Sequence, residues 1–230
     1  MVGVILTTFN FLNKTRVSLS SFLKATTYPH RLVVVDNHST DGTLEYLRQK
    51  GLEVIPNSAD TSLATALNQG IRHFLANPKI AYIAWIHNDM LFFPGWLKEL
   101  VRMLKERPAI GKLAPHNLAG DPSQHSPANI ENFRQAHRDH LEVGNACPWL
   151  MRKAVVQEVG LFNESYLRCG GYEDWDYNNR LLEKGYGVFV TRGSVVWHEG
   201  MGTRKHIPQE EAAQHNAHLY TERWGPGSRA

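Results

Sequence analysis

The sequence predicts an α/β protein with a doubly wound, mostly parallel sheet, flanking helices and a single domain. Two observations predict this fold. Short apolar runs are continuous rather than alternating, which is typical of strands covered on both faces. Stretches with helical character separate these runs, so that strand–helix–strand repeats three times in the first half of the chain. In such sheets, ligands bind beyond the carboxyl ends of the strands.

The individual elements follow from apolar periodicity and from turn residues. Strands are expected at residues 2–8, 31–36, 52–55, 81–86 and 110–115, and helices at 14–25, 43–49, 61–75 and 95–107. Residues 116–140 are polar without a clear period and predict a long functional loop. Beyond it we expect extended segments at 147–151, 187–191 and 194–197, and helices at 153–159, 174–184 and 209–224.

Composition narrows the class of protein. Apolar residues make up 42% and charged residues 20% of 230 residues, which suits a folded globular chain. Lys and Arg number 25 against 22 Asp and Glu, and this slight, dispersed excess gives little support for nucleic-acid binding. Cys147 and Cys169 indicate reduced thiols rather than a disulfide framework. No run reaches the ~20 apolar residues of a membrane span, so we expect a cytoplasmic protein that reaches the inner membrane face only peripherally.

Polar clusters follow two of the expected strands. Asp36 ends one strand and leads into a helix start, where a carboxylate can accept hydrogen bonds from a nucleobase or a ribose. Capping of the helix explains Asp41 but not an acid at the strand end. His87-Asn88-Asp89 closes another strand, and Asp89 offers an oxygen ligand for Mg²⁺ or Mn²⁺. A simple turn cap is the alternative for this second cluster.

A third cluster, residues 170–176, places three carboxylates at the start of a helix beside a Gly-Gly pair and aromatic side chains. Helix capping accounts for one or two of the three acids. An ionised Asp here can act as a general base. His198, at the end of a short strand, is a further candidate metal ligand.

The order of these pieces resembles family 2 of the glycosyltransferases, which have the GT-A fold. The resemblance rests on residues 7–10 (TTFN), 33–43 (VVVDNHSTDGT), Asn57 with 66–71 (ALNQGI), 87–89 (HND), 159–164 (VGLFNE), 173–176 (EDWD) with Arg180, His198 and 223–225 (RWG). It runs from the first strand to the tail. It implies one GT-A domain over residues 1–230, with a nucleotide-binding half (1–115) and an acceptor and catalytic half (116–230).

The resemblance also implies an inverting transferase that uses a UDP-, GDP- or dTDP-sugar with Mn²⁺ or Mg²⁺. The implied catalytic residues are Asp174, the base, and Glu173, which binds hydroxyls. The implied residues for donor binding are Thr8, Asn10, Asp36, Asn68 and Asn88, and those for metal binding are Asp89, His198 and His87. Two departures stand out: Leu67 replaces a frequent arginine, and His87 replaces the first acid of Asp-x-Asp.

Two other classes stay open on the sequence alone. A non-catalytic nucleotide-sugar-binding protein is compatible with both departures. A sugar-phosphate nucleotidyltransferase has a similar α/β layout but favours a glycine-rich phosphate loop, which residues 8–14 lack. The acceptor is open among glycan, lipid-linked sugar, protein and small molecule. Four histidines of the polar stretch, His116, His125, His137 and His140, are expected to be solvated rather than to contact the acceptor.

Overall fold

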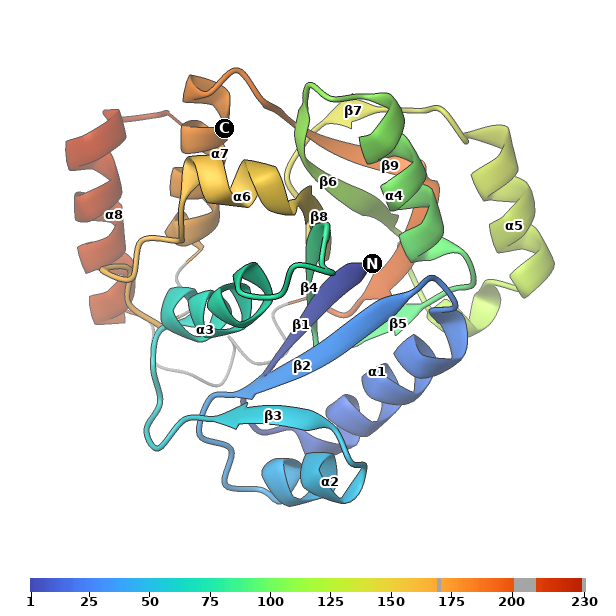
Figure 1. Ribbon diagram of the computed structural model, residues 1–230, viewed down its shortest axis with the longest axis horizontal. Helices are drawn as coiled ribbons and strands as arrows, with labels where there is room; N and C mark the ends of the chain where they lie inside the picture. Colours follow the sequence, from blue (N-terminus) through green and yellow to red (C-terminus); the bar gives the residue numbers. More distant parts are fainter. Residues whose placement is uncertain (169–170, 201–209, 229–230) are drawn as a thin grey trace.

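The computed structural model describes residues 1–168, 171–200 and 210–228. Within these ranges, nine strands form one mixed sheet (Figure 1). The strands are β1 (Val2–Thr8), β2 (His30–Asp36), β3 (Glu53–Pro56), β4 (Tyr82–His87), β5 (Met90–Phe92), β6 (Ile110–Asn117), β7 (Glu142–Val143), β8 (Trp149–Arg152) and β9 (Gly187–His198). Their order is β3-β2-β1-β4-β8-β6-β9-β5, with β7 paired to β9 outside this path.

Helices cover both faces of the sheet (Figure 1). They are α1 (Leu12–Ala25), α2 (Thr43–Gln49), α3 (Leu63–Leu75), α4 (Trp96–Glu106), α5 (Pro127–Ala136), α6 (Lys153–Val159), α7 (Tyr172–Glu183) and α8 (Glu210–Trp224), with a 3₁₀ turn, η1 (Pro122–Gln124). Apolar side chains of α1, α2 and α4 pack on one face, and those of α3, α6 and α7 pack on the other. The predicted doubly wound α/β fold is confirmed.

The strands are apolar throughout because successive side chains point into different cores. Val4 and Leu6 of β1 belong to the core under α1 and α4, whereas Ile5 between them belongs to the core under α3. Gly3 is required at its position, since a Cβ there would come within 2.5 Å of the Phe74 ring. Both faces of β1 are therefore covered, as its continuous apolar run predicts.

Parallel pairing brings three strand ends to one edge. β1 lies between β2 and β4, with Thr8 opposite Asp36 and Thr7 opposite His87. The long strand β9 then reaches the same edge from the second half of the chain. It runs parallel to β6 at first and antiparallel to β5 at its end, where His198 lies opposite Met90. The sheet thus carries residues from both halves of the sequence to one edge.

The polar stretch at 116–140 is the main difference from the prediction. We expected an irregular loop, but β6 extends to Asn117 and the segment contains η1 and α5. Pro127 starts α5, and the Ser126 side chain accepts a hydrogen bond from the Asn129 N–H. Ile130 is the single buried residue of this helix. Its sequence therefore lacks the apolar period by which a helix is recognised.

The expected strands at 187–191 and 194–197 also differ, because they form the single strand β9. At the expected break between the two strands, the pairing of β9 with β6 is irregular, with a shift of register between Pro115 and His116. The polar pair Arg192-Gly193 led to the prediction of two strands. Among the described residues, no helix has both the length and the apolar character needed to cross a bilayer.

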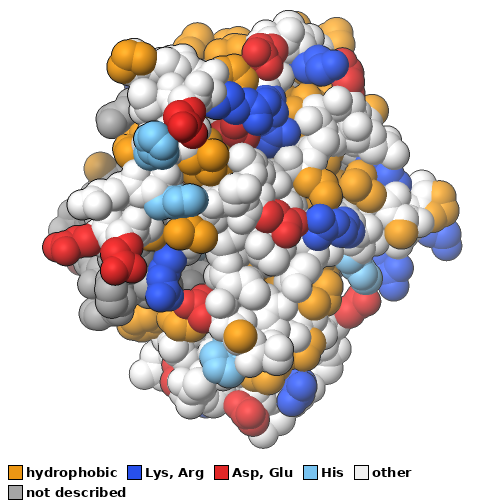
Figure 2. Space-filling model, turned by 90° about the vertical axis from the view of Figure 1, so that its left-hand side faces the viewer, with side chains coloured by type: hydrophobic (Ala, Val, Ile, Leu, Met, Phe, Trp, Pro, Cys, Tyr) orange, Lys and Arg blue, Asp and Glu red, His pale blue; other side chains and the backbone are white. Residues whose placement is uncertain are grey.

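The C-terminal helix α8 packs against α7. Trp224 Nε1 donates to Asp176 Oδ1 at 3.0 Å, and Asn179 Nδ2 donates to the Tyr220 hydroxyl at 2.8 Å. Asp176 is fully buried and also pairs with Arg180 at 2.9 Å. Figure 2 shows the face that includes α8, where acidic, basic and histidine side chains are interspersed. The tail therefore fixes α7 from outside the sheet.

Candidate active site

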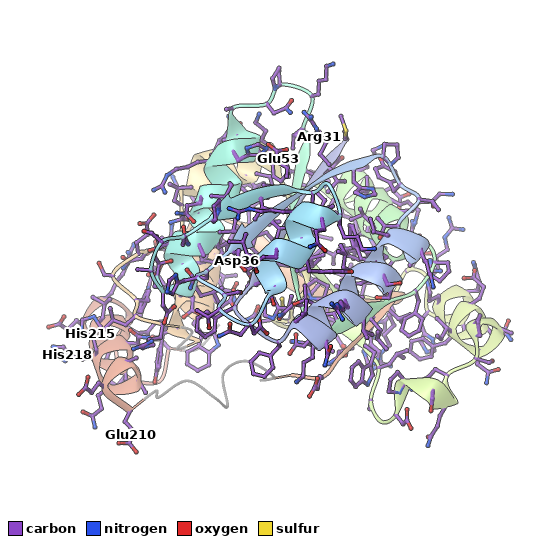
Figure 3. The ribbon with its side chains drawn as sticks, turned by 90° about the horizontal axis from the view of Figure 1, so that it is seen from below. Arg31, Asp36, Glu53, Glu210, His215 and His218 are labelled. Carbon is purple, nitrogen blue, oxygen red and sulfur yellow. The ribbon has the colours of Figure 1, made fainter. Side chains whose placement is uncertain are left out.

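The first predicted binding pair, Thr8 and Asp36, comes together at the ends of β1 and β2. The Thr8 hydroxyl donates to Asp36 Oδ1 at 2.8 Å. Ser39 adds two further donors to the carboxylate, its backbone N–H at 3.0 Å and its hydroxyl at 2.6 Å. Asp36 has no exposed surface and lies in the interior near α2 (Figure 3). In this conformation its carboxylate shapes the turn after β2 rather than facing open space.

Two predicted donor-binding residues, Asn10 and Asn88, hold neighbouring loops. Asn10 Oδ1 accepts from the Thr40 N–H at 2.8 Å. Asn10 has a positive φ of 56°, a conformation that asparagine tolerates better than most residues. Asn88 Nδ2 donates to the Asn10 carbonyl at 3.2 Å and to Thr15 Oγ1 at 3.0 Å. The two side chains connect the ends of β1, β2 and β4.

The Asn68 side chain joins α3 to the segment that precedes α7 through hydrogen bonds. It is fully buried, donates to the Phe162 carbonyl at 2.9 Å and accepts from the Phe162 N–H at 2.9 Å. It also donates to Glu164 Oε1 at 2.8 Å, and Arg72 donates to the same oxygen. Both polar ends of the Asn68 amide are thus used inside the protein. Leu67, at the position where the family often has arginine, is buried.

A cavity of about 770 Å³ lies beside this part of the sheet edge. Thr61 and Ser62, at the start of α3, line one side, and Glu210 and Glu211, at the start of α8, line another. Figure 3 shows Glu210 on α8, well away from Asp36. Arg168 also lines the cavity and makes an ion pair of 2.7 Å with Asp60. The cavity is lined by charged side chains of both signs and by the apolar side chains of Leu167 and Ala212.

The predicted metal ligands converge. One ligand atom from each of His87, Asp89 and His198 lies within 4.8 Å of the others. Asp89 Oδ1 is 3.1 Å from His198 Nε2 and 3.9 Å from His87 Nδ1. The ring atoms His87 Nε2 and His198 Nε2 are buried, and among the described residues neither makes a well-formed hydrogen bond. The three side chains therefore form one compact cluster around the Asp89 carboxylate.

The surroundings of His87 favour its neutral form. The ring packs on Trp85 with centroids 4.2 Å apart, and the His198 ring lies edge-on at 5.2 Å. Burial, together with His198, lowers the pKa of His87 to about 4, although Asp89 opposes the shift. A neutral imidazole has a lone pair free for a metal. Two imidazoles and one carboxylate therefore fit a divalent transition metal such as Mn²⁺.

The predicted catalytic pair lies at the start of α7. Glu173 is buried, with 4% of its surface exposed, whereas the Asp174 side chain is 22% exposed. Helix α7 begins after Gly171, whose φ of 87° suits glycine. Gly170 and Cys169, part of the predicted loop, lie outside the described residues. Of the two acids, Asp174 has the more accessible carboxylate.

Lys112 and Cys147 contact this region and were not predicted from the sequence. Lys112, on β6, is fully buried, and its Nζ lies 3.5 Å from Asp174 Oδ1. Burial lowers the pKa of Lys112, and Asp174 opposes that shift. Burial raises the pKa of the Cys147 thiol, and the charges of both Asp174 and Asp89 raise it further. The pKa of this one thiol thus responds to a carboxylate from each of the two predicted groups.

A sequence signal for Lys112 existed but was weak. The run Ile110–Asn117 has a single charged residue inside an otherwise apolar strand. A lysine in such a strand predicts either an edge strand or a buried partner. The four histidines of the polar stretch have mixed surroundings. His116 and His137 pack on Phe133, while His125 Nε2 hydrogen-bonds the Ala119 carbonyl.

Comparison with characterised and solved proteins gives the same class. The chain is 25% identical to N-acetylglucosaminyl-diphospho-decaprenol L-rhamnosyltransferase of Mycobacterium tuberculosis, over 86% of this chain and 76% of that protein. It is 24% identical to an uncharacterized glycosyltransferase of Haemophilus influenzae, over 79% of this chain and 61% of that protein.

Solved structures share the fold. GalNAc-T7 with UDP, GalNAc and Mn²⁺ matches 99% of this chain at a TM-score of 0.71 and 15% identity. The mannosyltransferase PcManGT of Pyrobaculum calidifontis, in complex with GDP-Man and Mn²⁺, matches 88% at 0.66 and 20% identity. S. aureus TarS in complex with UDP-GlcNAc matches 96% at 0.70 and 16% identity. This chain spans 48%, 57% and 65% of those three chains.

These likenesses establish the GT-A arrangement of the sheet and helices. The model of glycosyl transferase family 2 matches residues 3–160, which is more than half of the chain. The polar strand ends, the converging ligands and this match lead to one conclusion: the chain belongs to family 2 of the glycosyltransferases.

Proposed function

We propose that this protein transfers a sugar from a nucleotide diphosphate to an acceptor hydroxyl, with inversion at the anomeric carbon and with a divalent cation. The observation that carries the proposal is the cluster of His87, Asp89 and His198, whose ligand atoms lie within 4.8 Å of one another. The charges of Asp89 and Asp174 both raise the pKa of the Cys147 thiol, which supports placing the trio and Asp174 in one region. A ligand for the leaving diphosphate and a base for the acceptor are thereby available in one region.

The nucleoside end of the donor is assigned to the ends of β1 and β2. Thr8 and Asp36 are the proposed contacts, with Asn10, Asn68 and Asn88 fixing the loops around them. The turn at Ser39 must open for Asp36 to accept a hydrogen bond from a base, because the carboxylate is fully covered. Binding of the nucleoside is therefore expected to change the conformation of this turn.

The diphosphate end is assigned to the metal trio. Asp89 and His198 are the proposed principal ligands, and His87 is the third. When bound, a divalent cation neutralises the charge that develops on the departing diphosphate.

Asp174 is the proposed base. Its partly exposed carboxylate accepts the proton of the acceptor hydroxyl as that oxygen attacks the anomeric carbon. The carbon–diphosphate bond breaks on the opposite side, so a single displacement inverts the configuration. Glu173, which is buried beside it, is proposed to orient hydroxyls rather than to take the proton.

The acceptor is proposed to be a saccharide hydroxyl. The support is the similarity to a mycobacterial rhamnosyltransferase whose name specifies a sugar linked to a diphospho-lipid. A water-soluble saccharide carrying a diphosphate is therefore the first acceptor to test. Approach of the inner membrane face through a partner is part of the same proposal.

A thermal-shift panel tests the function. UDP-, GDP- and dTDP-sugars are added to the purified protein with Mn²⁺ or with EDTA, and donor hydrolysis is followed for every pair that shifts the unfolding midpoint. We expect one nucleotide class to raise the midpoint only with the cation and to be slowly hydrolysed. Binding without any hydrolysis or transfer would favour a non-catalytic binding protein. No shift with any donor would refute the proposal.

A further inference from the structure

Lys112 is a fully buried lysine in the middle of the sheet. It lies on β6 opposite Met151 of β8 and Val188 of β9, both of which are buried in the core under α6 and α7. Removing an ammonium group from water costs several kcal/mol unless a partner compensates the charge. A lysine at this position therefore requires an explanation from its surroundings.

The ionic partner of Lys112 is the proposed base. Its Nζ is 3.5 Å from Asp174 Oδ1, and within the described parts of the chain neither atom has a well-formed hydrogen bond. The Asp174 side chain is 22% exposed while the lysine is completely covered. The ammonium thus lies behind the carboxylate, on its protein side, and leaves the outer side of the carboxylate accessible.

An anchoring role for this ion pair is poorly supported, because α7 has a better anchor. Asp176, one residue past Trp175, is fully buried and is held by Arg180 at 2.9 Å and by the Trp224 indole at 3.0 Å. Those contacts have hydrogen-bond geometry, whereas the Lys112–Asp174 contact does not. The helix is therefore fixed without Lys112.

The charges around Asp174 explain why a cation is needed there. Glu173 precedes it on α7, and Cys147, from the segment before β8, faces it together with Lys112 from β6. Asp89 acts on the same thiol. Neighbouring acids disfavour the ionised form of a carboxylate, while an adjacent ammonium favours it. Lys112 is the basic side chain that faces Asp174 in this cluster.

We propose that Lys112 is a positioning residue for the transfer reaction: its buried Nζ, behind the Asp174 carboxylate, holds that carboxylate directed outward to accept the proton of the acceptor hydroxyl. The proposal rests on the proposed function, because it needs Asp174 to be the base.

The test compares Lys112→Met with Lys153→Met. The first change keeps the length and apolar packing of the side chain but removes the charge. Lys153 provides the control, since its Nζ donates to the Asn77 carbonyl, at 2.9 Å, in a purely structural contact. We measure donor Kd, kcat for transfer or donor hydrolysis from pH 5.5 to 9.5, and the unfolding midpoint of each variant.

We expect Lys112→Met to lower kcat at pH 7 by about tenfold or more while the donor Kd stays within about twofold, because a misdirected base slows the proton transfer without weakening donor binding. The control is expected to keep the wild-type profile.

A double-mutant cycle separates positioning from general structure. In an Asp174→Asn background, Lys112→Met is expected to cost no further activity, because the lysine acts through the carboxylate. An equal loss in both backgrounds, or an unchanged kcat and pH profile in Lys112→Met, would overturn the proposal. If Lys112→Met does not fold, Lys112→Gln, which keeps an N–H donor, is measured in its place with the same expectations.

The two proposals fail in different ways. An active wild type whose Lys112 variant behaves identically refutes the role of Lys112 alone. A wild type that neither binds nor turns over any donor refutes the proposed function, and the positioning role with it.

Discussion

The two parts of the sheet edge differ in how they satisfy their polar groups. We call the ends of β1 and β2, with Thr8, Asn10 and Asp36, the nucleoside edge, and we call His87, Asp89, His198, Lys112 and Asp174 the reaction edge. At the nucleoside edge, the Asp36 carboxylate is covered and accepts three hydrogen bonds from the protein. At the reaction edge, buried nitrogens of His87, His198 and Lys112 have no well-formed hydrogen bond within the described residues.

This difference distinguishes a part of the edge that serves as a scaffold from a part that is the better candidate for catalysis. Buried polar groups are almost always hydrogen-bonded, and exceptions in native proteins often mark sites for an ion or for catalysis. The polar groups of the nucleoside edge are already hydrogen-bonded within the protein. Under our proposal, the turn after β2 must open slightly before this edge can bind a nucleoside. The reaction edge contains the groups that we propose to bind a cation and the substrates. Changes at the reaction edge should therefore alter rate and metal affinity, and changes at the scaffold should alter stability.

The largest effect is expected for Asp174→Asn. The amide keeps the shape of the side chain but cannot take the acceptor proton, so kcat should fall by about 10²–10⁴-fold with little change in donor Kd. Steady-state kinetics together with calorimetric donor binding measure both quantities. Wild-type turnover in this variant would show that Asp174 is not the base.

The second-largest effect is expected for Asp89→Ala. It removes the carboxylate ligand from a trio whose other members are imidazoles, so Mn²⁺-dependent donor affinity should fall by at least about tenfold. Calorimetry with and without EDTA measures this change, and Glu199→Ala, which breaks an exposed ion pair with Lys14, serves as the control. Equal donor affinity in all of these conditions would contradict the metal assignment.

His87→Asp sharpens the comparison by changing the metal preference. The proposed site has two imidazoles and should favour Mn²⁺ or Co²⁺ over Mg²⁺, because imidazole is a softer ligand than a carboxylate. Replacing one imidazole by a carboxylate should raise the affinity for Mg²⁺ several-fold relative to Mn²⁺. Metal-induced shifts of the unfolding midpoint, measured without donor, report this ratio directly. An unchanged ratio would show that His87 is not a ligand.

The smallest effect is expected at Glu164, which belongs to the scaffold. Hydrogen bonds from Asn68 and Arg72 lower the pKa of Glu164 against the opposing effect of burial. A carboxyl group whose folded-state pKa is lowered stabilises the fold above its unfolded-state value of 4.5 and loses this contribution as the pH falls below it.

Glu164→Gln should therefore be less stable than wild type at pH 7, and the difference should shrink between about pH 5 and pH 3. Urea unfolding at several pH values measures it, and kcat per folded molecule should stay at the wild-type level. A large loss of kcat without a loss of stability would break the distinction between scaffold and reaction edge.

Most of the fold could be predicted because its signals are local. The continuous apolar run of β1 and the glycine and threonine around the start of α2 carry their own information about strand and helix. Helix α5 was missed because it buries only Ile130 and so has no apolar period. The two segments predicted inside β9 were divided by Arg192 and Gly193, although the strand continues past a pairing irregularity.

The sequence by itself determined the class of the protein and the candidate ligands, since strand ends and helix starts place Asp36, Asp89 and Asp174 at predictable points along the chain. Only the tertiary structure decided which partners these acids have. The Asp36 carboxylate accepts hydrogen bonds from Ser39 and Thr8. The Asp174 carboxylate lies next to the Nζ of Lys112, which is 62 positions away in the chain. Electrostatic partnership depends on distance through space across β6, β8 and α7, and no local pattern in the sequence encodes that distance.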